Sequence, residues 1–281
     1  MLSKSEKEVL GIDLPVGSHH YRAFVGSSSL YDLVAATQFN LLTALGLREY
    51  HYLLDIGCGS LRAGRLFIPY LLSGRYFGIE PEPWLIEASM ANEIGNDLIR
   101  IKKPTFSHDR NFTLSIFNQK FDFVLAQEIF IHASQAQISK CLSEAKKVMN
   151  PTAVFAATFR EGQDNYEGND WHYPDCIEYT LNRMRELAAE QGLICKPFDW
   201  PHPGPQSWLL YIHPENESNT LELSAGAEPL RLLSKLRYTE NRLNCWENHP
   251  HVGLIARMNR VTNDVLKKVR NLGISVKSKI G

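Results

Sequence analysis

Short hydrophobic runs alternate with amphipathic helical patterns between residues 49 and 213. Strand-length runs occupy 52–56, 76–80, 98–102, 121–126 and 153–159, with turn residues at their borders. Between them, apolar residues recur at three- and four-residue spacing, which predicts helices over 61–71, 84–94, 134–149 and 176–191. This alternation predicts an α/β fold in which a parallel sheet is covered by helices on both faces.

Two more strands close the sheet. Residues 193–200 and 207–212 are strand-like, and the proline-rich turn 201–205 between them is too short for a helical crossover. The last strand should therefore run antiparallel in a doubly wound, seven-stranded sheet. We expect three regions: an N-terminal segment and cap helix (1–48), the core (49–214), and a linker with an amphipathic helical tail (215–281). The tail would pair subunits in a homodimer or dock on a partner.

Composition narrows the class of protein. The chain has 281 residues and a formal net charge of −1, so bulk electrostatics give no reason to expect binding to duplex DNA. Its five cysteines form no C-x-x-C pair, which argues against a disulfide framework or a zinc site and suits a reducing compartment. No apolar stretch approaches the roughly 20 residues of a transmembrane helix. We expect a cytoplasmic protein.

The chemistry concentrates where the strand 52–56 ends. Gly57-Cys58-Gly59-Ser60 follows it and a helical pattern begins, an order typical of nucleotide-binding units. Asp55 lies just before the glycines, where its carboxylate would repel a pyrophosphate and attract an ammonium group. Glu80 ends the next strand, and a carboxylate there can accept two hydrogen bonds from a ribose diol.

These motifs resemble those of the class I S-adenosylmethionine-dependent methyltransferases. The glycines Gly57, Gly59 and Gly64 do not have the dinucleotide spacing G-x-G-x-x-G. Residues 54–60 look like the first motif of this family, 78–80 like its second, and 121–132 like its fourth-strand segment. The resemblance covers residues 50–213 and implies S-adenosylmethionine as the cofactor.

The resemblance also implies roles for particular residues. Asp55 and the Gly57–Gly59 loop would hold the methionine ammonium end, Glu80 the ribose, and Pro81 or Glu82 the adenosine. Asp109 would face the adenine amine, or it is a plain loop acid. Arg62 would bind the cofactor's carboxylate or an acidic acceptor, or it pairs with Glu80 or Glu82. The expected cofactor contacts are Asp55, Gly57, Cys58, Gly59, Arg62, Glu80, Pro81, Asp109, Arg110 and Gln127.

Three residues are candidates for catalysis: His132, Glu128 and His172. His132 would be the general base that removes an acceptor proton, or it packs structurally under the sheet edge. Glu128 and His132 are similar to part of the metal-binding string of some RNA 2′-O-methyltransferases, but Ile131 replaces the second acid. Because two ligands are too few, we expect no metal site.

The acceptor is the least constrained part of the prediction. The loop 161–173 is rich in aromatic and acidic residues, which would suit a small hydroxylated molecule, preferably a carbohydrate. Residues 19–22 would close over the cofactor. The expected function is O-methylation of such a metabolite. The alternatives are an RNA methyltransferase, an NAD-linked oxidoreductase and a non-catalytic partner-binding scaffold.

Overall fold

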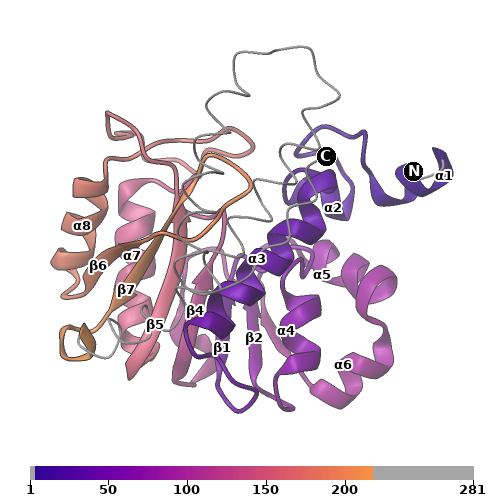
Figure 1. Cartoon of the computed structure of the whole chain (residues 1–281), viewed down its shortest axis with the longest axis horizontal. Coiled ribbons are helices and arrows are strands. Elements are labelled where there is room, and N and C mark those ends of the chain that lie inside the picture. Colours follow the sequence, from indigo (N-terminus) through magenta and orange to yellow (C-terminus); the bar gives the residue numbers. More distant parts are fainter. Residues whose placement is uncertain (1–3, 218–281) are drawn as a thin grey trace, which may run out of the picture.

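The chain folds around one seven-stranded sheet. The computed structural model describes residues 4–217 (Figure 1). The strands lie in the order β3-β2-β1-β4-β5-β7-β6. Their bounds are β1 Leu53–Ile56, β2 Tyr76–Ile79, β3 Thr105–Ser107, β4 Phe121–Ala126, β5 Met149–Phe159, β6 Ile194–Phe198 and β7 Ser207–Ile212. β7 runs antiparallel to both β5 and β6, and the other pairs are parallel. The expected seven-stranded, doubly wound sheet is confirmed.

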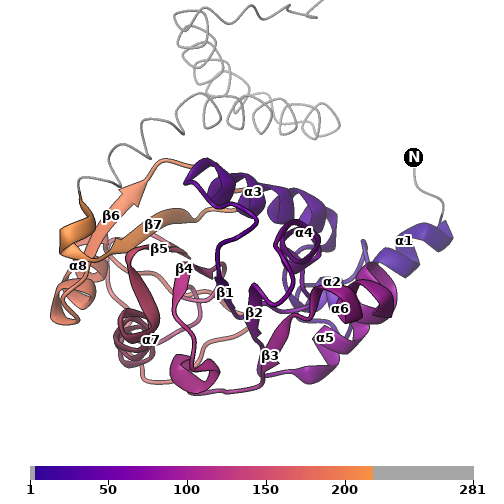
Figure 2. The same ribbon diagram turned by 90° about the horizontal axis from the view of Figure 1, so that it is seen from below.

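Helices cover both faces of this sheet (Figure 2). One face carries α3 (Tyr31–Ala44), α4 (Gly64–Tyr70), α5 (Pro83–Ser89) and α6 (Asn96–Lys102); the other carries α7 (Gln135–Val148) and α8 (Leu181–Glu190). Short helices α1 (Lys4–Leu10) and α2 (Tyr21–Phe24) precede them. Single helical turns are η1 (Ser28–Leu30), the π-helical η2 (Met90–Ile94), η3 (Leu114–Phe117) and η4 (Pro214–Asn216).

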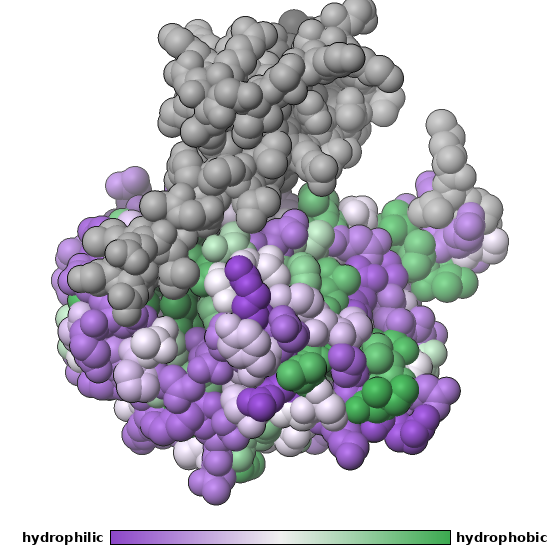
Figure 3. All heavy atoms as spheres, turned by 60° about the horizontal axis from the view of Figure 1, so that its bottom comes forward, coloured by the Kyte–Doolittle hydropathy of each residue, from purple (hydrophilic) through white to green (hydrophobic). Residues whose placement is uncertain are grey.

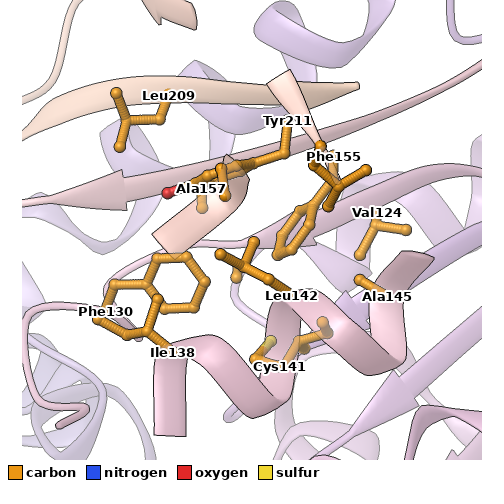
Figure 4. Close-up of a cluster of buried hydrophobic side chains, with 14 of the residues drawn as sticks. Val124, Phe130, Ile138, Cys141, Leu142, Ala145, Phe155, Ala157, Leu209 and Tyr211 are labelled. Atoms are coloured by element: carbon orange, nitrogen blue, oxygen red, sulfur yellow. The ribbon is translucent and has the colours of Figure 1, made fainter. Parts of the chain in front are cut away.

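The α7 helix shows how local sequence and packing agree. Ser134 begins it with a capping box: the Gln137 amide N–H donates to Ser134 Oγ (3.4 Å), and the Gln137 side chain accepts from Ser134 N–H (2.8 Å). Its apolar stripe packs on β5 and β7 (Figure 4), where Leu142 and Phe155 are fully buried. This packing fixes the β4–α7 loop, residues 127–134, at the carboxyl end of β4.

Two predicted elements were wrong. Residues 98–102, expected as the third strand, belong to α6, and the third strand is β3 instead. A five-residue stretch with three apolar residues does not distinguish a strand from a helix segment, and here the stretch packs against α4 and η2 as part of α6. The helix expected from residue 176 begins only at Leu181, because Thr180 caps it by accepting from Arg183 N–H (3.1 Å). Residues 161–180 instead form a loop across the sheet edge.

The outer surface is mixed in character. On the face shown in Figure 3, hydrophobic side chains form separate patches among predominantly polar ones. Within residues 4–217, no helix is long and apolar enough to cross a membrane. The amphipathic helices expected over 229–246 and 252–272, and with them the expected docking surface, lie outside the described residues. The division into three regions stays a prediction.

Candidate active site

A cavity of about 640 Å³ opens at the carboxyl ends of the parallel strands, where the strand order reverses between β1 and β4. Ligands of doubly wound sheets bind at this switch point. We distinguish two sides of the cavity. The β1–β2 side is lined by Gly57, Gly59, Ile79, Glu80, Pro81 and Asp109. The β4–β7 side is lined by Glu128, Ile131, His132, Trp171, Tyr173, Cys176 and Gln206, together with Phe24 and Gly26 of the N-terminal segment. Arg62 and Gln127 lie between the two sides.

The glycine turn leaves no room for side chains. Gly57 and Gly59 have left-handed backbones, with φ of +67° and +55°. A Cβ on Gly59 would lie 2.7 Å from Val25 Cγ1, and a Cβ on Gly57 would collide with Ile129 Cδ1. Both glycines line the cavity, so bare backbone faces whatever binds there. We call this surface of Gly57 and Gly59 the glycine cradle; a Cβ at either position would fill it.

The Glu80 carboxylate locks this turn to the end of β2. One oxygen accepts from Gly59 N–H and the other from Glu82 N–H, each at 2.9 Å. Burial raises the pKa of Glu80 to about 7, although these two hydrogen bonds oppose the shift. The side chain is therefore pre-positioned, and its raised pKa makes its charge near neutrality sensitive to what binds beside it. A ligand that donates hydrogen bonds or brings positive charge would ionise it.

Asp55 lies beneath the turn and does not line the main cavity. It lines a small adjoining cavity of about 20 Å³, which shares Gly57, Gly59, Arg62 and Gln127 with the larger one. Its carboxylate accepts from the Tyr76 hydroxyl (2.7 Å), and burial raises its pKa to about 6. Cys58 lines the same small cavity, and its Sγ fills the space beside Gly78.

Arg62 forms neither of the ion pairs considered from the sequence. Its guanidinium pairs with Glu128 (2.6 Å) and donates to the Val25 carbonyl (2.7 Å). Glu128 accepts a further hydrogen bond from Gln206 (3.1 Å) and has a left-handed backbone (φ +60°). Burial alone would raise the pKa of Glu128, but Arg62 and His202 outweigh it, and the net pKa is lowered. Glu128 therefore stays ionised and paired.

Gln127 offers an unpartnered acceptor between the two sides of the cavity. Its amide nitrogen lies 2.6 Å from His202 Nε2, and the side chain is 6% exposed. Its Oε1 is buried and lacks a hydrogen-bond partner among the described residues. A buried carbonyl oxygen without a donor costs free energy, roughly 1–3 kcal/mol. A ligand ammonium or amide group would satisfy it.

The His132 ring is held in place through its Nδ1 nitrogen. Its Nδ1 lies 2.8 Å from the Asp175 carbonyl oxygen and 3.2 Å from that of His172. Because carbonyl oxygens only accept, Nδ1 must carry the proton and Nε2 must be the basic nitrogen. Burial lowers the pKa of His132, against the opposing hydrogen bonds and the charge of Glu128. His132 lines the cavity as a ready proton acceptor.

His172 does not join this cluster. Its side chain is exposed and packs against Tyr166, with ring centroids 5.8 Å apart. It does not line the cavity, and its contact with His132 is through the backbone: His172 N–H donates to the His132 carbonyl (2.8 Å). The structure brings Glu128 and His132 to one cavity and leaves the His172 ring outside.

Pro81, Asp109 and Arg110 border the outer rim of the β1–β2 side. Arg110 pairs with Glu82 (2.9 Å) and donates to the Pro81 carbonyl (3.2 Å). One oxygen of Asp109 accepts from the backbone N–H groups of Asn111 (2.9 Å) and Thr113 (2.7 Å). Asp109 thus stabilises its own loop, and it also lines the cavity.

The N-terminal segment closes the cavity, but with other residues than expected. Phe24, Val25, Gly26 and Ser27 line it, whereas residues 19–22 do not. Arg22 instead pairs with Glu93 in η2 and anchors the segment from behind. The Tyr173 hydroxyl donates to the Phe24 carbonyl, which joins the segment to the 161–180 loop. No motif marks Phe24 or Gly26, and only the tertiary fold brings them here.

No group of three or more His, Cys, Asp or Glu side chains that could hold a metal occurs within residues 4–217. Glu128 and His132 face the same cavity, but the Glu128 carboxylate is already occupied by Arg62 and Gln206. The four cysteines in this part of the chain are free thiols.

Comparison with known proteins agrees with this geometry. Residues 54–157 match the family model described as a methyltransferase domain. No curated protein sequence matches the chain.

The fold recurs in solved structures. Magnesium protoporphyrin IX methyltransferase from Synechocystis PCC 6803, with bound S-adenosylhomocysteine, superimposes with a TM-score of 0.50 at 13% identity, covering 75% of this chain and 95% of that one. A protein assigned as an O-methyltransferase from Nostoc punctiforme PCC 73102 gives 0.52 at 14% identity, covering 68% and 59%. The glycopeptide N-methyltransferase MtfA gives 0.50 at 8% identity, covering 64% and 94%.

The sheet order and the switch-point cavity are those of the class I Rossmann-like fold. Residues 54–157 match a methyltransferase domain, and the cofactor of this domain is S-adenosylmethionine. The residues present fit this cofactor: a glycine cradle, a buried carboxylate at the end of β2, and an unpartnered Gln127 oxygen beside Asp55.

Proposed function

We propose that this enzyme methylates a hydroxyl oxygen of a small neutral molecule, with His132 as the general base. The observation that carries the proposal is the state of His132: Nδ1 is tied to two carbonyl oxygens, and the basic Nε2 belongs to a side chain that lines the cavity. A nitrogen nucleophile presented as a free amine would not need such a base, whereas a hydroxyl must lose its proton when it is methylated.

Each cofactor contact expected from the sequence can be assigned to one part of S-adenosylmethionine from its place in the structure. Glu80 would accept from the ribose hydroxyls, while the bare backbone of Gly57 and Gly59 lets the cofactor approach the sheet edge. Gln127 Oε1 and, from the small cavity, Asp55 would face the methionine ammonium group. Arg62 would face its carboxylate. Pro81 and Asp109 would lie along the adenosine with Arg110 at the rim, and Cys58 would support the turn from beneath.

Bound S-adenosylmethionine supplies a sulfonium methyl group. In methyl transfer to a hydroxyl, the new carbon–oxygen bond would replace the carbon–sulfur bond, and His132 Nε2 would take the hydroxyl proton. The resulting imidazolium is stabilised by the two carbonyl oxygens on Nδ1 and by the ionised Glu128. Positioning of acceptor and donor can contribute about 7–11 kcal/mol to such a reaction, and a base about 10²–10⁴-fold in rate.

A carbohydrate acceptor was expected because the loop 161–173 is rich in aromatic and acidic residues, and in the structure only aromatic residues of this loop line the cavity. Trp171 and Tyr173 do line the cavity and would stack on a flat or apolar ligand face. The acidic residues of the same loop, Asp164, Glu167 and Asp170, do not line it. The supported acceptor is thus a hydroxylated molecule bound by aromatic walls, and the carboxylates that would recognise many sugar hydroxyls lie elsewhere. A cytoplasmic location remains our proposal and is consistent with the free thiols.

Methyl-labelled S-adenosylmethionine and a fractionated metabolite extract test this function. The wild-type protein should label a small molecule in an alkali-stable ether linkage, and the Asp55→Asn and His132→Asn variants should each reduce that labelling. Label in an ester, an amine or RNA would contradict the proposal. Binding of NAD without binding of S-adenosylhomocysteine would contradict the methyltransferase assignment itself.

A further inference from the structure

Aromatic side chains form a continuous wall on the β4–β7 side of the cavity. Its ring centroids are separated by 5.4 Å from Phe24 to Tyr173, 5.1 Å from Tyr173 to His132, and 5.6 Å from His132 to Trp171. All four side chains line the cavity, and Ile131 lies beside them. The Tyr173 hydroxyl is engaged by the Phe24 carbonyl, so this wall presents ring surface more than hydrogen-bonding groups.

The same side of the cavity carries no spare charge among its described residues. Its ionised side chains are Arg62 and Glu128, which neutralise each other at 2.6 Å. Both Glu128 oxygens are engaged, one by Arg62 and the other by Gln206. A phosphate, carboxylate or ammonium group on the acceptor would therefore be buried without a counter-charge, which is costly.

The base also suits a particular kind of hydroxyl. Burial keeps the pKa of His132 below its usual value, so the imidazole is a weak base. Phenolic hydroxyls ionise near pH 10, whereas the hydroxyl of water ionises only near 15.7. Proton transfer to a weak base is far less unfavourable from a phenol or enol than from an aliphatic alcohol.

We propose that the acceptor is an uncharged, flat, conjugated ring that carries a phenolic or enolic hydroxyl, packed against the wall formed by Phe24, Tyr173 and Trp171 with its hydroxyl at His132 Nε2. This inference rests on the proposed O-methyltransferase function and narrows its substrate class. A neutral sugar is the competing acceptor, and the aromatic wall alone would accommodate it. Beside the wall, Gln206 Oε1 is a buried oxygen without a hydrogen-bond partner among the described residues, which is too little to recognise the several hydroxyls of a sugar and favours the conjugated ring.

The chemistry of the labelled product distinguishes these classes. The full-length enzyme is incubated with methyl-labelled S-adenosylmethionine and a cell extract, and the product is partitioned at neutral pH. Our proposal predicts that the label passes through anion and cation exchangers, extracts into ethyl acetate and co-elutes with near-ultraviolet absorbance. Label that stays in water, or that an exchanger retains, overturns the inference while leaving the methyltransferase function intact. Absence of any labelled product, despite S-adenosylhomocysteine binding, would contradict the proposed function as well.

Substitution of Trp171 tests the wall itself. Trp171 is 43% exposed, so Trp171→Ala should fold normally. Loss of one stacking surface should raise KM for the labelled acceptor by about tenfold and leave S-adenosylhomocysteine affinity unchanged. Tyr50→Ala is the matched control, because Tyr50 is 55% exposed and does not line the cavity. Equal effects of the two substitutions, or an unchanged KM in Trp171→Ala, would count against the stacked ring.

Discussion

The two sides of the cavity are built in opposite ways. On the β1–β2 side, a short stretch of chain supplies the site, and burial raises the pKa of its acids, to about 7 for Glu80 and to about 6 for Asp55. On the β4–β7 side, Glu128 is already ionised and paired with Arg62. The carboxyl groups of the first side would be ionised by the positive charge and hydrogen-bond donors of a cofactor. On the second side, the charges of Arg62 and Glu128 already neutralise each other.

This difference separates two kinds of effect. Changes on the β1–β2 side should alter cofactor affinity and its pH dependence. Changes on the β4–β7 side should alter turnover or acceptor KM and leave S-adenosylhomocysteine binding as it is. A substitution that moves both quantities together would show that the two sides are not independent.

The largest expected effect is that of His132→Asn. Asparagine can still donate to the carbonyls of His172 and Asp175 but has no basic nitrogen, so kcat should fall by about 10²–10⁴-fold. S-adenosylhomocysteine affinity, measured by calorimetry, should change less than about twofold. His172→Asn is the control: its ring lies outside the cavity, and kcat should be unchanged. An inactive His172→Asn enzyme with normal cofactor binding would restore His172 as a catalytic candidate.

Gly57→Ala should weaken cofactor binding by about 100-fold or more. The added Cβ occupies the cradle and collides with Ile129, and the left-handed backbone costs a further ~1–2 kcal/mol in stability. Gly74→Ala separates the two causes, because Gly74 has nearly the same φ (+72°) with nothing within 4 Å of its Cβ position. The control should lose similar backbone stability and no S-adenosylhomocysteine affinity. Equal affinities in the two variants would disprove the cradle.

Glu80→Gln should reduce cofactor affinity by about 10–100-fold, since a hydrogen bond to a charged group contributes roughly 1.5–3 kcal/mol. The wild-type affinity should fall as pH drops below about 7, because the cofactor favours the ionised carboxylate. This pH dependence should be weaker in Glu80→Gln. Calorimetric titrations between pH 5.5 and 8.5 measure both effects, and identical pH profiles for the two proteins would contradict them.

The ligand-free protein should show the reverse dependence in its stability. The pKa of Glu80 in the folded state, about 7, lies above its usual value of 4.5. The folded protein therefore holds a proton that the unfolded chain releases, so this contribution is present at low pH and is lost as pH rises from about 4.5 to 7. Its size is on the order of 3 kcal/mol. Denaturant unfolding should show wild type losing more stability than Glu80→Gln over this range.

The smallest expected effect is that of Tyr173→Phe. It removes one hydrogen bond between the 161–180 loop and the Phe24 carbonyl and keeps the aromatic ring. A typical hydrogen bond contributes about 1 kcal/mol, so acceptor KM should rise by about fivefold. Cofactor affinity should stay within about twofold of wild type. If only cofactor affinity changed, the N-terminal segment would belong functionally to the β1–β2 side.

The difference between the two sides of the cavity also explains which parts of the site could be predicted from the sequence. Gly57, Gly59 and Glu80 were identifiable because strand, turn and carboxylate lie close together in the chain, and their geometry follows from local rules. The sheet was predictable for the same reason, apart from the short apolar run at 98–102. The Arg62–Glu128 pair was not, because it joins two strand ends whose adjacency depends on the sheet order.

The acceptor side was the least predictable. Phe24 and Gln206 lie far apart in the sequence and belong to no motif, yet both line the cavity. His132 was recognised as a candidate, but its tautomer depends on the carbonyls of His172 and Asp175, which the loop conformation places there. His172 looked equally suitable by residue type, and only the fold shows that it does not line the cavity.

The most direct test of the account is a calorimetric titration of S-adenosylhomocysteine into the full-length protein near pH 6.5, repeated in buffers of different ionisation enthalpy. We predict binding that releases protons as Glu80 and Asp55 ionise, and release that is reduced in Glu80→Gln. Binding without proton release, or heat with NAD and none with S-adenosylhomocysteine, would contradict the central claim that this cavity is built for an adenosyl cofactor with an ammonium group and ribose hydroxyls.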